Sequence, residues 1–112
     1  MADLATIDQW EVGRFADLVR KLGETEDANG ERLLDNTLAF FSSEIEDGNS
    51  HRHSNLPVLL AGAGGGIHNP GRHIVLPDTP IANLYLSMLQ GGGVDIDTFG
   101  SDGTSPLAEL VV

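Results

Sequence analysis

The sequence predicts an α/β chain in which a partial open sheet of two to three short strands is flanked by helices, and three observations predict it. An amphipathic stretch opens the chain, two short apolar runs lie at 37–41 and 56–61, and a second helical pattern follows Pro80. Two or three short strands form a poor independent sheet. We therefore expect residues 1–112 to form a single incomplete α/β domain, either an edge portion of a larger protein or half of an oligomer.

The first expected element is an amphipathic helix from about Ile7 to Leu22. Thr6 and Gln9 have the spacing of a capping box, and Gly23 follows the last apolar residue, as at many helix ends. The apolar side chains recur at helical spacing, mostly on one face: Ile7, Trp10, Phe15, Leu18, Val19 and Leu22.

Short apolar runs bounded by polar residues predict the strands. We expect strands at Thr37–Phe41, covered on both faces, at Leu56–Ala61 and at Arg72–Leu76. The glycine run 62–66 between the second and third strands predicts a tight connection. It also resembles a phosphate-cradling loop, but it lacks the Gly-Lys-Ser/Thr ending and no helix starts directly after it.

A second helix is predicted after the strands. Thr79 is expected to cap it and Pro80 to occupy its first position, because proline suits the first turn of a helix. The glycines at 91–93 are expected to end it. The predicted buried face consists of Ile81, Leu84, Tyr85, Met88 and Leu89.

Composition narrows the classes of function. The net charge is −11, from 17 acidic and 6 basic residues. This balance predicts no nucleic-acid partner and no anionic membrane partner, because phosphate binding needs clustered Lys and Arg. The absence of cysteine excludes disulfides and thiol chemistry. No apolar run approaches the ~18 residues of a membrane span, and the N-terminus lacks the pattern of a signal peptide, so the chain as written is expected in the cytoplasm.

The polar segment between the first two strands is the main candidate site. It follows the end of a strand, where open α/β sheets bind ligands, and it carries four candidate metal ligands: Glu44, Asp47, His51 and His53. His51 and His53 are two residues apart, so in extended backbone they point to the same side. With a carboxylate they would form a set suited to zinc, manganese or iron. The alternative is a solvated acidic loop with two exposed histidines.

Basic residues near this segment suggest an anion site. Arg52 lies between the two histidines, and Arg72 and His73 begin the third expected strand. Arginine offers a planar fork for phosphate, sulfate or carboxylate. The alternative for Arg52 is a surface charge or a structural ion pair. A calcium loop at Asp95–Pro106 is rejected, because Phe99 and Pro106 stand where oxygen ligands are required.

From Ile7 onward the chain resembles the C-terminal region of the HXXSHH family, a bacterial domain family of unknown function. Its most specific block is 47–57, which reads Asp-Gly-Asn-Ser-His-Arg-His-Ser-Asn-Leu-Pro. The other matching segments are 7–10 with Phe15, 33–37, 58–62, 71–73, 79–84 and 99–100.

The resemblance implies a larger protein. Full members are several times longer, begin with a twin-arginine export signal and carry their name-giving motif upstream, whereas this sequence has neither. The family is distantly similar to the alkaline phosphatase and sulfatase superfamily. That similarity implies Glu44 or Asp47 and His51 or His53 as metal ligands, with the nucleophile in an upstream segment.

Three hypotheses about function follow. The first is a C-terminal fragment that carries part of a metal and oxyanion site and is not catalytic alone; its partner would be the upstream segment, which would complete a phosphate- or sulfate-ester hydrolase. The second is a non-catalytic remnant, a small acidic domain that binds a partner or binds nothing. The third is a homodimeric metal-binding module, joined across a two-fold axis.

Overall fold

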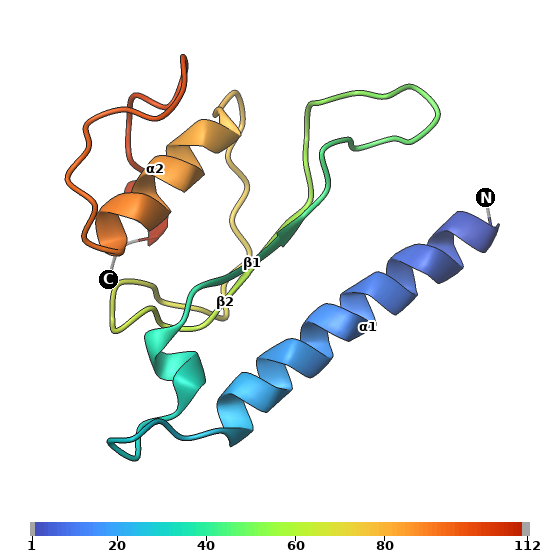
Figure 1. The fold of residues 1–112 in the computed structure, drawn as a ribbon. Helices are drawn as coiled ribbons and strands as arrows, with labels where there is room; N and C mark the ends of the chain where they lie inside the picture. The colour runs from blue at the N-terminus through green and yellow to red at the C-terminus, as the bar shows by residue number, and fades with distance from the viewer. Residues whose placement is uncertain (1, 111–112) are drawn as a thin grey trace.

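The computed structural model describes residues 2–110 and confirms a small α/β fold with two α-helices and one antiparallel sheet (Figure 1). Two short 3₁₀ helices complete the secondary structure. The elements in chain order are α1 Ala2–Glu24, η1 Leu33–Asn36, β1 Ala39–Ser42, β2 Val58–Ala61, α2 Ile81–Gly91 and η2 Ala108–Leu110. Among residues 2–110, no helix combines the length and the apolar character that crossing a bilayer requires.

Helix α1 is longer than the sequence predicts, since it begins at Ala2 and ends at Glu24. The predicted capping box is therefore wrong. Thr6 lies inside the helix, and its hydroxyl donates to the Ala2 carbonyl oxygen one turn back, at 3.0 Å. Gly23 lies inside the last turn, three residues before the C′ position that an αL cap would occupy, so it does not end the helix.

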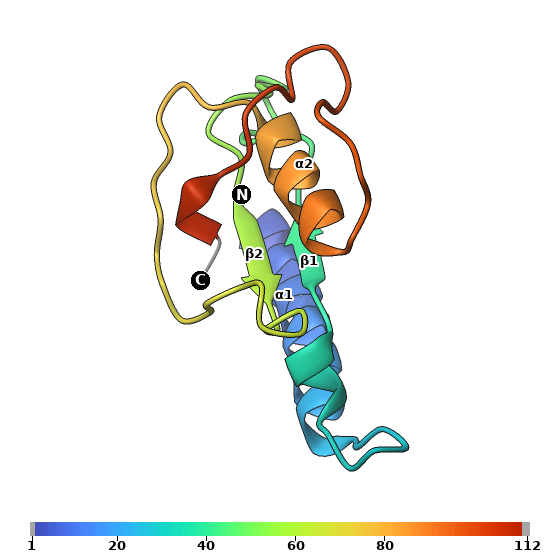
Figure 2. The ribbon, with the colours of Figure 1, turned by 90° about the vertical axis from the view of Figure 1, so that its left-hand side faces the viewer.

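The sheet is a two-stranded hairpin placed between the two long helices. β1 and β2 pair antiparallel, with Phe40 opposite Leu60 and Phe41 opposite Leu59. In Figure 2, α1 lies behind the hairpin and α2 in front of it. Phe41 stacks on Phe15 of α1 at a centroid distance of 5.3 Å, and Phe40 meets Tyr85 of α2 edge-on at 5.6 Å. β1 is thus in contact with a helix on each face, as the sequence predicts.

The predicted third strand, Arg72–Leu76, is wrong. These residues form an irregular segment in which Val75 is 75% exposed. A strand needs a partner ladder, and within residues 2–110 β2 pairs only with β1. The Arg72 guanidinium instead donates to the backbone carbonyls of Asn69 and Glu109, at 3.0 and 2.6 Å, and so links this segment to η2.

Helix α2 forms the centre of the small core. Leu86 is fully buried, and Ala82 and Leu84 are nearly so, together with Ala39 of β1 and Leu107 of the tail. The expected Thr79 cap is wrong, because Pro80 is the N-cap residue and the Thr79 hydroxyl donates to the Pro77 carbonyl.

The C-terminal tail, residues 94–110, turns up beside α2, passes over its start and descends on the other side (Figure 2). Polar side chains of α2 hold it there. The buried Asn83 amide oxygen accepts from the backbone N–H groups of Thr104 and Ser105, at 3.1 and 3.2 Å. The Ser87 hydroxyl accepts from the Leu107 N–H at 2.6 Å. The tail is therefore part of the domain.

Candidate functional site

The polar loop, residues 43–57, connects β1 to β2 and extends well beyond the sheet (Figure 1). Because the strands are antiparallel, the carboxyl end of β1 and the amino end of β2 lie at the same end of the hairpin, and the loop closes that end. The rule that places ligands outside the carboxyl ends of strands applies to parallel α/β sheets, and it therefore does not support a site here.

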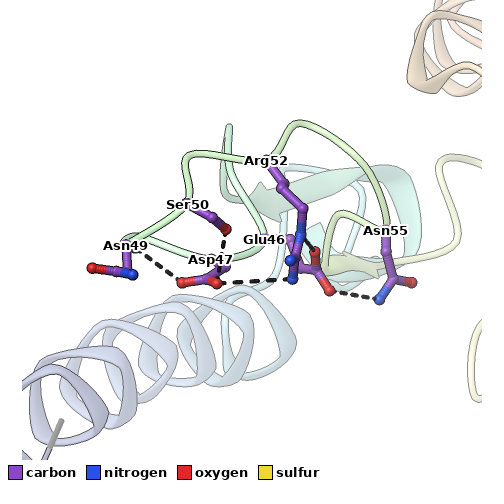
Figure 3. A network of polar contacts seen from close by, with 6 residues as sticks. All are labelled: Glu46, Asp47, Asn49, Ser50, Arg52 and Asn55. Atoms are coloured by element: carbon purple, nitrogen blue, oxygen red, sulfur yellow. Dashed lines mark hydrogen bonds and ion pairs between the residues drawn. The ribbon is translucent and has the colours of Figure 1, made fainter.

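Arg52 organises the loop through an ion-pair network (Figure 3). Its Nε lies 2.8 Å from Oε2 of Glu46, and its Nη2 lies 3.8 Å from Oδ2 of Asp47. The Asn55 amide donates to the other oxygen of Glu46 at 3.2 Å. The Glu46 N–H also donates to the Arg52 carbonyl, so side chains and backbone close the loop at the same place. Arg52 is thus a structural ion-pair partner in this fold.

Hydrogen bonds keep both carboxyls of the network ionised. The bond from Arg52, followed by the bond from Asn55, lowers the pKa of Glu46. The Asn49 backbone N–H and then the Ser50 hydroxyl lower the pKa of Asp47. The hydrogen bond to Glu46 raises the pKa of Arg52. All three groups are charged at neutral pH, and the carboxylates are occupied by donors within the loop.

The two histidines of the loop lie apart from this network. His53 Nδ1 lies 2.8 Å from the backbone carbonyl oxygen of Glu44. A carbonyl only accepts, so Nδ1 carries the proton and Nε2 keeps its lone pair in the neutral ring. His51 is exposed and has a left-handed backbone with φ of 53°. Within residues 2–110, no three His, Asp or Glu side chains gather where they would hold a metal ion. The proposed ligand set Glu44, Asp47, His51 and His53 stays a prediction.

The predicted anion-binding residues Arg52, Arg72 and His73 stay a prediction, and both arginines already have partners within the chain. Arg52 is paired within the loop, Arg72 binds two backbone carbonyls, and His73 is exposed. The glycine run 62–66 serves as the tight connection that the sequence favours, because three of its N–H groups donate to backbone carbonyls at the end of η1 and just after it. Those donors are not available to a phosphate.

Two buried polar residues, His68 and Asn83, were not predicted from the sequence. His68 is 8% exposed, and its Nδ1 lies 2.7 Å from the Gly62 carbonyl oxygen. Asn83 is equally buried and holds the tail. The apolar surroundings of Asn83 within the helical pattern were a usable signal, since a polar residue on a core face needs a partner. His68 lines a cavity of about 220 Å³ beside Leu60 and Met88.

The chain matches no protein-family model, and neither a curated protein nor a solved structure matches it. The resemblance to the HXXSHH family therefore stays a prediction. The likeness to the alkaline phosphatase fold likewise stays untested, while the α/β character itself is established by the two helices and the hairpin.

Proposed function

We propose that this chain is a non-catalytic, partner-binding part of a larger assembly and that the outward face of α1 is its binding surface. One observation carries the proposal: α1 has 23 residues, and none of them is buried. Its exposed large apolar side chains are Leu4, Ile7, Trp10, Val12 and Leu18.

The physical argument concerns what holds α1 in place. Inside the domain its main aromatic contact is the stack of Phe15 on Phe41. Most helical stability in proteins comes from packing an apolar face, because isolated helices are marginal in water. Single exposed apolar residues are ordinary, but several along one helix are typical of contact surfaces. A partner covering this helix would supply the missing burial.

Two partners fit the proposal. One is the upstream segment that the family resemblance implies, and the other is a second copy of this chain. In either case any chemistry would depend on groups that the partner brings to the polar loop.

Hydrogen exchange of the full chain tests the proposal. At a concentration where the chain is monomeric, the amides of α1 should exchange much faster than those of α2, whose side chains form the core. A matched reference is available within the same molecule, since both are regular helices. Equal protection of α1 and α2 in the monomer would mean that the domain is complete without a partner, and the proposal would fail.

A metal-binding contribution of the polar loop is a second candidate. The hydrogen bond of His53 Nδ1 to a backbone carbonyl favours it, because metal-binding histidines usually orient one nitrogen in this way and bind through the other. Isothermal titration with zinc and manganese compares the chain with the His51→Ala, His53→Ala double variant. A Glu26→Ala variant is the control, since Glu26 lies outside the loop. Equal heats for all three proteins would remove the metal assignment.

A further inference from the structure

The exposed face of α1 carries three apolar and three charged side chains at heptad spacing. Positions spaced alternately by three and four residues form one stripe along a helix, the arrangement by which two helices pack as a coiled coil. The stripe consists of Leu4, Ile7, Glu11, Arg14, Leu18 and Lys21.

The apolar side chains of this stripe are about half exposed and flank the side of α1 that packs on the hairpin. Leu4, Ile7 and Leu18 are 56%, 51% and 49% exposed. The half-buried apolar residues of the helix, Phe15 and Leu22 among them, lie beside the stripe and face the sheet. One side of α1 is thus used within the domain while the heptad stripe is left open. Figures 1 and 2 show the helix lying along one side of the molecule.

When two copies of the stripe run antiparallel, complementary residues lie opposite each other. An antiparallel copy centred between Glu11 and Arg14 places Glu11 opposite Arg14 of the second copy. The same operation places Ile7 opposite Leu18, and Leu4 opposite the aliphatic stem of Lys21. A two-fold axis repeats each contact, so the pairing yields two apolar layers and two charge pairs at the centre.

Charge along the whole helix favours the same orientation. Residues 2–13 of α1 carry three acidic residues and no base, while residues 14–24 carry three bases against two acids. Antiparallel pairing sets the acidic half of one copy against the basic half of the other, whereas parallel pairing sets like charges together. Arg14 is engaged locally by Asp17 at 2.9 Å, but this exposed pair is of the kind that contributes little.

We propose that the partner of α1 is a second copy of this chain, bound through an antiparallel α1–α1′ coiled coil across a two-fold axis. This inference rests on the proposed function, because it names the partner of the same surface. The net charge of −11 on each copy opposes association at long range. Physiological salt screens charges that are more than about 8 Å apart, so the repulsion between the two copies is weak away from the interface.

Disulfide trapping tests the orientation. The chain has no cysteine, so Ile7→Cys and Leu18→Cys variants each carry a single thiol. When the two variants are mixed and oxidised, the 7–18′ disulfide should exceed the two like disulfides together by on the order of tenfold. In the proposed dimer the two 7 positions lie about 16 Å apart along the axis, too far for a disulfide.

A matched control pair lies on the opposite side of α1. In the proposed dimer, positions whose numbers add up to 25 lie at the same level along the axis, as 7 and 18 do. Positions 9 and 16 meet this condition and are exposed, so Gln9→Cys and Ala16→Cys are matched to the test pair. Mixing these variants should give the statistical distribution of disulfides. A statistical mixture from the 7 and 18 variants, or an excess of their like disulfides, would overturn the antiparallel dimer.

Charge reversal tests the central pairs by sedimentation equilibrium. Glu11→Arg and Arg14→Glu should each raise the dimer dissociation constant by on the order of tenfold, and the double variant should restore it to within about threefold. Arg20→Glu is the control, because it also loses exposed ion pairs to Asp17 and Glu24 but faces about 120° away from Arg14.

The outcomes separate this inference from the proposed function. A chain that stays monomeric at millimolar concentration, with unprotected α1 amides, would overturn the homodimer and leave the partner-binding proposal standing. A monomer with a fully protected α1 would remove both. A dimer whose dissociation constant is unaffected by Glu11→Arg and by Arg14→Glu would show that association uses another surface, and the inference would fail.

Discussion

The buried Asn83 amide is one of the α2 side chains that attach the C-terminal tail, and Asn83→Ala tests its contribution. The Asn83 oxygen accepts two backbone N–H bonds, from Thr104 and Ser105. The net contribution of such a bond is about 1 kcal/mol, so the variant should lose ~2 kcal/mol of unfolding free energy. That is a large fraction of the 5–15 kcal/mol that is typical of a domain.

Urea unfolding followed by far-ultraviolet circular dichroism measures this loss. Hydrogen exchange adds a local readout, since the amides of Thr104 and Ser105 should exchange faster in the variant while those of β1 change little. Asn49→Ala is the matched control: its side chain is exposed, and only its backbone N–H takes part in the loop network. We expect the control to change stability by about 0.5 kcal/mol or less. Unchanged exchange at 104 and 105 in Asn83→Ala would refute the assigned role of the amide.

Two further predictions concern the glycine turn and the polar loop. Gly62→Ala should destabilise the fold by about 2–5 kcal/mol, because its φ is +89° and a Cβ there would overlap a backbone carbonyl oxygen. Gly66 has a φ of +97° but open space around it, so Gly66→Ala should cost only the backbone strain of about 1–2 kcal/mol. Equal losses of unfolding free energy for the two variants in urea would contradict this account. Folding lowers the pKa of Glu46 and Asp47, so their contacts stabilise the fold above the unfolded-state pKa, and this contribution is lost as the pH falls through the folded values. In a carboxyl NMR titration, Arg52→Gln should raise the pKa of Glu46 more than that of Asp47, and equal rises would argue against the network.

The sequence predicted those helices and strands whose formation depends mainly on residues close together in the chain. The apolar runs at 37–41 and 56–61 became β1 and β2, with ends shifted by at most two residues. The Pro80 signal located α2 within one residue. The helical spacing of apolar residues predicted α1 but missed its first five residues. Threonine is common at helix N-caps, so Thr6 was predicted to precede the helix, whereas its hydroxyl bonds to the Ala2 carbonyl oxygen inside the helix.

The third strand was predicted wrongly because its formation depends on contacts between residues far apart in the chain. Residues 72–76 have the composition of a short strand, but pairing depends on whether a neighbouring edge is reachable. Here the Arg72 guanidinium is fixed by carbonyls at Asn69 and Glu109, the latter 37 residues away in the chain. Nothing in the five residues themselves encodes that contact.

The candidate site, too, was predicted in part by the sequence and decided in part by the tertiary structure. Sequence alone identified 42–55 as the segment in which charge and imidazole concentrate, because residue type and spacing are local properties. Only the tertiary structure decided that Arg52 pairs with Glu46 and Asp47 while the His53 ring bonds to the Glu44 carbonyl oxygen, since side-chain direction depends on how the loop closes on itself. In the same way, the heptad stripe of α1 was present in the sequence, but the packing of Phe15 against Phe41 decided that the stripe faces solvent. Periodicity determines which residues share a helix face, and the fold determines which face is left open for a partner.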